Sequence, residues 1–61
     1  MIRKGSIVRY IGSNELANGK IFRVHKRSYN RVLVCFPLRY LDGSVHGSQS
    51  YIPLDDFEEV K

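Results

Sequence analysis

The sequence predicts an all-β fold, a small barrel of five short strands with a short helical turn before the last strand. Three observations predict it. Residues 31–36 contain five apolar residues in a row and lie between turn-forming residues and a proline, which is typical of a central strand. Shorter runs rich in β-branched and aromatic residues precede and follow this segment. Turn dipeptides such as Asn18-Gly19 and Asp42-Gly43 separate the runs at close spacing, as in small barrels.

The length of the chain sets the size of the core. With 61 residues it forms one domain, residues 1–61, and a chain of this size buries only about 60% of the surface that it exposes when unfolded. Its apolar share of 43% argues against disorder. We therefore expect one ordered domain with little room for a deep pocket beside the core.

Residues 7–11 are expected to form the first strand, and if Val8 and Tyr10 point inward, Arg9 points outward between Ile7 and Ile11. Gly12 and the polar residues after it end this strand. Residues 14–19 then form either a single helical turn capped by Asn14 or a loop that packs Leu16 onto the barrel.

The second strand is expected over residues 20–26, and its register has two interpretations. If Ile21 and Val24 both enter the core, a β-bulge must lie between them, because they are not an even number of residues apart. Without a bulge, Phe22 and Val24 are the inward pair. We favour the bulge.

The central strand is expected to point Val32, Val34 and Phe36 inward. Pro37 cannot donate a backbone hydrogen bond, so it ends this strand or marks a sheet edge. A polar strand over residues 45–52 follows. Its edge at residues 45–50 is weakly specified in register and could pair with a strand of a partner.

The C-terminal segment begins at Pro53, which stops that strand and favours a short helical turn over residues 53–56. Residues 57–60 then complete the barrel with Phe57 and Val60 inward.

Few residues in the chain carry chemistry suited to catalysis or metal binding. Cys35, His25 and His46 are the only candidates for a nucleophile, a base or a soft metal ligand, and the apolar setting of Cys35 indicates a packed side chain. Three scattered ligands do not match a zinc site. The remaining acidic cluster is typical of a solvated edge and contains Asp55, Asp56, Glu58 and Glu59. We expect no catalytic residue, no metal, no cofactor and no enzymatic activity.

The single cysteine and the N-terminus bear on location. One cysteine forms no internal disulfide, which fits a reducing compartment, and Arg3 and Lys4 are not followed by the apolar stretch of a signal peptide. The longest uncharged apolar run, residues 32–38, is too short to cross a bilayer. We expect a cytoplasmic protein without membrane insertion.

Four segments resemble a known architecture: residues 4–9 (KGSIVR), 19–24, 32–36 and 52–60. Together they are similar to an SH3-like barrel, and most similar to the photosystem I reaction-centre subunit IV family, related small cyanobacterial barrels and barrels of the KOW type. The likeness consists mainly of core and turn positions, which report fold. It implies a docking module on a larger assembly that has no catalysis of its own.

Charge is distributed unevenly along the chain. Residues 1–39 contain nine of the ten Lys and Arg and one acid, which gives +8, whereas residues 40–61 contain one Lys and five acids, which gives −4. Such a basic region attracts phosphate backbones, anionic lipid or acidic protein surfaces.

A basic face with interleaved aromatic residues is the candidate binding site. Aromatic rings and arginines are preferred anchors of protein interfaces, and the same residue types bind single-stranded nucleic acid on small β-barrels. We expect docking on a protein partner or larger complex, and single-stranded DNA or RNA binding is the alternative. The face comprises Arg9, Phe22, Arg23, Lys26, Arg27, Tyr29, Arg31, Arg39 and Tyr40.

Overall fold

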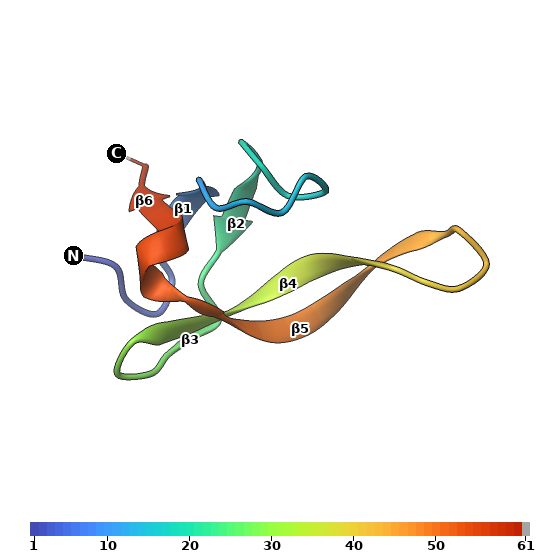
Figure 1. The fold of residues 1–61 in the computed structure, drawn as a ribbon. Helices are drawn as coiled ribbons and strands as arrows, with labels where there is room; N and C mark the ends of the chain where they lie inside the picture. The colour runs from blue at the N-terminus through green and yellow to red at the C-terminus, as the bar shows by residue number, and fades with distance from the viewer. Residues whose placement is uncertain (61) are drawn as a thin grey trace.

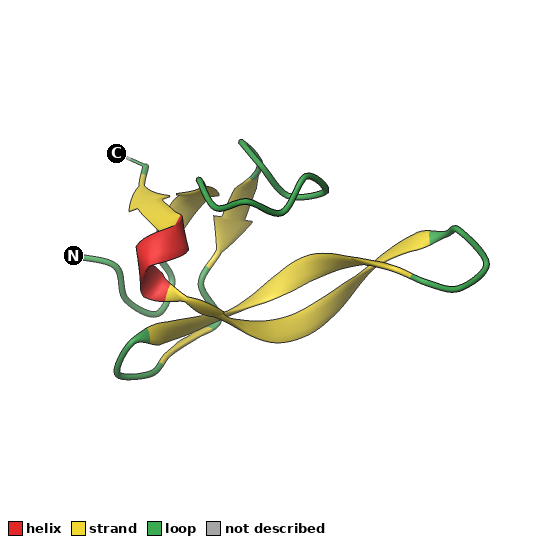
Figure 2. Cartoon of the chain, viewed as in Figure 1, coloured by secondary structure: helices red, strands yellow, loops and turns green. Residues whose placement is uncertain are grey.

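Two three-stranded antiparallel sheets make up the protein in the computed structural model, which describes residues 1–60 (Figures 1 and 2). The first sheet has the order β2 (Ile21–Arg23), β1 (Ile7–Tyr10) and β6 (Phe57–Glu59). The second has the order β3 (Lys26–Arg27), β4 (Arg31–Arg39) and β5 (Val45–Pro53). A 3-10 turn, η1 (Leu54–Asp56), joins β5 to β6. The all-β prediction is confirmed, and so is the helical turn before the last strand.

The prediction of a closed five-stranded barrel is wrong, because the two sheets do not close on each other and the described chain has six strands. The cause is the long pairing between β4 and β5, nine residues each, whose far part extends away from the rest of the molecule (Figure 1). The principal extents of 37 × 18 × 16 Å reflect this projection.

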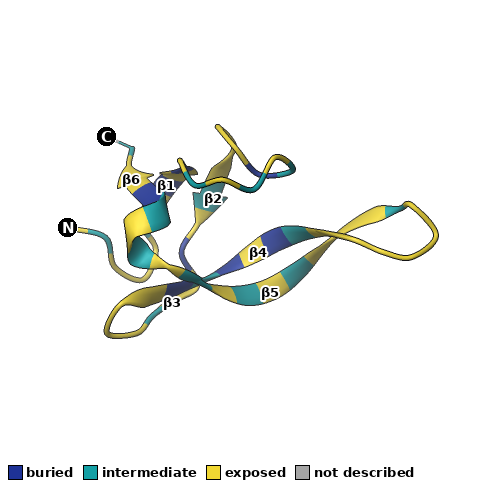
Figure 3. Cartoon of the chain, viewed as in Figure 1, coloured by how far each residue is buried: buried dark blue, intermediate teal, exposed yellow. Residues whose placement is uncertain are grey.

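The core lies where the two sheets face each other, and the inward positions follow the period of two that the sequence predicts. Val32, Val34 and Phe36 of β4 are buried, as are Val8 and Tyr10 of β1 (Figure 3). Ala17, Val24 and Phe57 complete the set of buried residues. Full burial of an aliphatic or aromatic side chain contributes about 1.5–3 kcal/mol, so these few residues carry most of the stability.

Four aromatic rings join the two sheets. Phe36 of β4 lies edge-on to Tyr10 at 5.1 Å between ring centroids and stacks on Phe22 at 5.6 Å. Phe57 of β6 contacts Tyr10 at 5.5 Å and Phe22 at 6.1 Å, both edge-on. Such ring pairs each add about 0.5–1.5 kcal/mol beyond the area that they bury.

The bulge expected in the second strand is absent, and the alternative interpretation is confirmed. β1 and β2 pair without interruption, with Val8 opposite Phe22 and Arg9 opposite Ile21. Phe22 therefore enters the aromatic cluster, while Ile21 is half-exposed. The predicted strand is also divided, because the chain crosses from the first sheet to the second after Val24 and resumes as β3.

The loop between β1 and β2 is a series of turns that Asn14 organises. Its Oδ1 accepts a hydrogen bond from the Leu16 N–H at 2.9 Å, and its carbonyl accepts from Ala17 and Asn18. Ala17 is fully buried, and Leu16 is only half-buried. The alanine is thus the residue that anchors this loop in the core.

β4 continues through Pro37 to Arg39, so this proline marks an edge and does not end the strand. The Tyr40 N–H donates to the Ser44 carbonyl at 2.8 Å, and hydrogen-bonded pairs alternate from there along the hairpin. Pro37 and Pro53 both fall at positions whose nitrogen faces away from the partner strand. No β4–β5 hydrogen bond is lost at either proline.

Candidate binding surfaces

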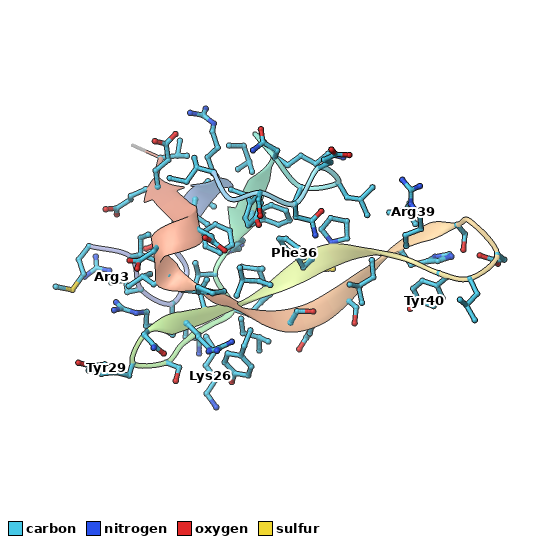
Figure 4. The ribbon with its side chains drawn as sticks, in the orientation of Figure 1. Arg3, Lys26, Tyr29, Phe36, Arg39 and Tyr40 are labelled. Atoms are coloured by element: carbon cyan, nitrogen blue, oxygen red, sulfur yellow. The ribbon has the colours of Figure 1, made fainter. Side chains whose placement is uncertain are left out.

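The nine residues of the predicted face lie in four places and do not form one continuous surface. Arg39 and Tyr40 lie at the far end of the long hairpin, and Lys26 and Tyr29 lie at the opposite end of the second sheet (Figure 4). Arg9 and Arg23 lie on the outer face of the first sheet. Arg27 and Arg31 lie beside Tyr29, and Phe22 is half-buried and packs against the core.

Phe22 is the one member that packs inside. It stacks on Phe36 and contacts Phe57, because its position opposite Val8 places it on the inner face of the first sheet. We therefore reassign Phe22 from the predicted binding face to the aromatic cluster.

The outer face of the first sheet combines arginines with exposed isoleucines. Arg9 Nη1 donates to Glu58 Oε1 at 3.1 Å, and both side chains are about half exposed. An exposed pair of this kind stabilises by about 0–1 kcal/mol. Its main consequence is that Glu58 offsets the charge of Arg9, so Arg9 contributes little to a basic potential on this face.

The turn between β3 and β4 carries three of the ten basic residues, Lys26, Arg27 and Arg31; we call residues 26–31 the proximal turn. Arg27 is half-buried there, and its Nη1 donates to the Ile2 carbonyl at 2.6 Å while its Nη2 donates to the Tyr29 carbonyl at 3.4 Å. Arg27 thus connects the N-terminal segment to the turn. Tyr29 has 92% of its surface exposed and lies in the chain between the exposed cations Lys26 and Arg31.

The far end of the β4–β5 hairpin, residues 37–47, is the hairpin tip. Its backbone turn is at residues 40–44, where the Gly43 N–H donates to the Tyr40 carbonyl at 2.9 Å. Leu41 is fully exposed at 110% of its reference area. Other large apolar side chains of the tip are also exposed, namely Leu38, Tyr40 and Val45.

Side-chain contacts fix the conformation of the tip. Asp42 Oδ1 accepts hydrogen bonds from the Ser44 hydroxyl at 2.5 Å and the Ser44 N–H at 2.9 Å. These bonds hold the pKa of Asp42 below its ordinary value, because they favour the carboxylate, and the hydroxyl contributes more than the N–H. His46 Nε2 lies 2.9 Å from the same hydroxyl, and its ring packs edge-on against Tyr40 at 4.9 Å.

Sequence reasoning placed Arg39 and Tyr40 correctly beside a turn but did not include Leu38, Leu41 or Val45. The sequence nevertheless contained a signal for the exposure of these three residues. Apolar residues that flank an Asp-Gly turn at the end of a hairpin lie beyond the reach of a small core. Their exposure follows from the length of β4 and β5 past Phe36.

Cys35 is exposed, so the prediction of a packed thiol is wrong. It alternates with the buried Val34 and Phe36 and therefore points to the outer face of the second sheet. Within residues 1–60 no group of three or more His, Cys, Asp and Glu side chains gathers as a metal site, and no pocket is present. The same residues include no helix with the length and apolar character that crossing a membrane requires.

Comparison with protein-family models, with curated proteins and with solved structures finds no match for this chain. The surfaces described above are therefore the basis on which we infer a function.

Proposed function

We propose that the protein is a non-enzymatic binding module that docks on a larger protein assembly through the hairpin tip. The observation that carries the proposal is the exposure of Leu38, Tyr40, Leu41 and Val45 on a hairpin that extends beyond the rest of the fold (Figure 4). Leu38 and Tyr40 share one face of the hairpin, Val45 lies on the other, and Leu41 lies at the turn. Large apolar side chains gathered at one exposed end of a small protein mark an interaction site.

The residue types of the tip favour a protein partner. Aromatic residues, arginine and aliphatic side chains make the centre of protein interfaces. Arg39 is the one cation of the tip and Asp42 its one acid, so the tip carries no net positive charge with which to neutralise a run of phosphates. We expect the protein partner to present an apolar groove that receives Leu41 and Tyr40, with a carboxylate at its rim that pairs with Arg39.

The conformation of the tip also supports docking. Asp42, Ser44 and Gly43 hold the turn through short hydrogen bonds before any partner binds. Binding then costs less conformational entropy than ordering a flexible loop would.

The proximal turn favours a second candidate function, binding of single-stranded nucleic acid. Tyr29 is almost fully exposed and lies between the exposed cations Lys26 and Arg31. An exposed ring stacks on a base, and the cations neutralise phosphates. This candidate uses the end of the second sheet opposite to the tip, so the two functions are separable by substitution.

Quantitative affinity capture from nuclease-treated native lysate tests the first function. We expect the wild type to enrich specific proteins that Y40S/L41S loses and that the matched proximal variant K26S/R31S retains. Equal enrichment by the wild type and Y40S/L41S would contradict docking through the tip.

A fluorescence titration with labelled single-stranded oligonucleotides tests the second function. Binding should weaken linearly with the logarithm of salt concentration, and K26S/R31S should reduce that slope by about one for each phosphate that the variant no longer neutralises. Absence of binding at low salt would remove this candidate, and loss of binding in Y40S/L41S with retention in K26S/R31S would transfer it to the tip.

A further inference from the structure

We propose that the free edge of β5 pairs antiparallel with β5 of a second copy of this chain, about a two-fold axis at Ser48. The second sheet then continues from one copy into the other. This inference rests on the strand edges and does not depend on the proposed function.

The edges of the first sheet are short or charged. β2 and β6 are its edge strands, each of three residues. The described part of β6 also carries Glu58 and Glu59, and charged side chains discourage a further strand from pairing.

The opposite edge of the second sheet is protected as well. β3 is two residues long and consists of Lys26 and Arg27. Beyond β3, the outer edge of β4 carries Pro37, which has no N–H, and Arg39.

The outer edge of β5 has none of these protections. The strand is nine residues long, no strand within residues 1–60 pairs with its outer side, and no Asp, Glu, Lys or Arg occurs between Asp42 and Asp55. A long, uncharged, unpaired edge is a template for a further strand.

The register of the hairpin identifies the backbone groups on this edge. Because the Tyr40 N–H bonds to the Ser44 carbonyl, the even-numbered residues of β5 direct their backbone groups toward β4. The odd-numbered residues direct theirs outward. The outward set is Val45, Gly47, Gln49 and Tyr51.

A two-fold axis at Ser48 gives each of these outward residues a hydrogen-bonding partner in the second copy. Val45 then lies opposite Tyr51 of the second copy, and Gly47 lies opposite its Gln49, so each outward residue exchanges bonds with another outward residue. A centre at Gln49 places Pro53, which lacks an N–H, opposite Val45. A two-fold axis between two residues places each outward-facing residue opposite one whose backbone groups face β4, so no ladder of hydrogen bonds forms.

The side chains favour a second copy as the occupant. Val45 and Tyr51 are both exposed and both lie on the outer face of the sheet, and the two-fold axis brings each against the other. Aromatic rings paired with β-branched residues are favourable across strands. Gly47 leaves room for the longer Gln49 side chain. The neutral strand also lets two chains of net charge +4 approach without like charges at the contact.

Sedimentation equilibrium over a concentration series up to about 1 mM tests the association, since an edge contact of this length is weak. We expect a dimer whose dissociation constant rises about tenfold or more in Gln49→Pro, which removes an outward N–H at a position equivalent to those of Pro37 and Pro53. Gln49→Lys, which keeps the backbone N–H, should also weaken the dimer through like charges. Gln49→Thr is the matched control and should leave it unchanged.

Cysteine cross-linking tests the register in a Cys35→Ser background. Ser48→Cys should form a disulfide-linked dimer under mild oxidation, because facing residues at a non-hydrogen-bonded position have Cα atoms about 4.5 Å apart. Ser50→Cys alone should not, because Ser50 faces His46 of the second copy, and a mixture of the Ser50→Cys and His46→Cys chains should cross-link.

A monomeric wild type at all these concentrations would overturn the proposal. So would a dimer that neither Gln49→Pro nor Gln49→Lys weakens, since another surface would then hold the copies together. A monomer that instead binds an extended peptide along β5 would show that the edge serves a different partner, and this too would overturn pairing with a second copy.

Discussion

Gly47 of β5 lies directly against the sulfur of Cys35 on β4: a Cβ atom at position 47 would stand 2.5 Å from Cys35 Sγ. No side chain fits at that distance without displacing the sulfur. We expect Gly47→Ala to lower the free energy of unfolding by at most about 1 kcal/mol, because the sulfur ends an exposed side chain that can rotate away. Chemical denaturation of the variant measures it.

A double-mutant cycle attributes this cost to the Cys35 contact. Cys35→Ala removes the sulfur, so Gly47→Ala should be much less destabilising in that background. Additive effects of the two substitutions would show that the glycine is required for another reason.

Arg27 gives a second expected outcome, because it connects the proximal turn to the Ile2 carbonyl. Arg27→Ala should destabilise the protein by about 1–2 kcal/mol, since a hydrogen bond from a charged donor is removed and the carbonyl is left without it. Lys26→Ala, at the exposed neighbour, is the matched control and should stay within about 0.5 kcal/mol of the wild type. Equal losses in the two variants would contradict the connecting role.

The inward residues of the strands could be predicted from the sequence because burial there follows local periodicity. Val32, Val34 and Phe36 alternate along one strand, and Val8 and Tyr10 do the same. The same alternation points Cys35 outward. The outward position of Cys35 was missed because the residue lies in an unbroken apolar run. Its apolar neighbours suggested burial, although the period of two indicated exposure.

That the two sheets stay separate could not be predicted, because the arrangement of the sheets depends on contacts between distant segments. Pro37 was compatible with either an end or an edge, and only the register with Gly47 shows that the strand continues past it. The role of Arg27 depends on Ile2, which is distant in sequence. The exposure of the candidate residues was therefore predicted in part: Arg39 and Tyr40 lie at an exposed tip, whereas Arg27 and Phe22 are half-buried.

The pH dependence of the tip follows from Asp42. Hydrogen bonds from Ser44 lower its pKa below the ordinary 3.8, so its stabilising effect is present above that value and is lost as the pH falls through the lowered pKa. Between pH 5 and 8 this group should cause no change. In an NMR titration of the side-chain carboxyl carbon, Ser44→Ala should raise the pKa of Asp42 toward 3.8, and Ser48→Ala should not. An unchanged pKa in Ser44→Ala would contradict the assigned cause.

The exposed position of Cys35 gives a direct chemical test. A thiol on the outer face of the second sheet should react with an aromatic disulfide reagent in the native protein at a rate within about tenfold of that in denaturant. Reaction of the native protein slower by orders of magnitude would place the thiol inside the core.

Amide hydrogen exchange along β5 tests most directly whether the long hairpin is paired in the register described. In dilute solution, the N–H groups of His46, Ser48 and Ser50 should exchange slowly because they face β4, and those of Gly47 and Gln49 should exchange fast because they face solvent. This alternation is the expected result. Uniformly fast exchange from Val45 to Tyr51 would show that β4 and β5 do not pair. That result would contradict both the exposed hairpin tip and the free edge of β5.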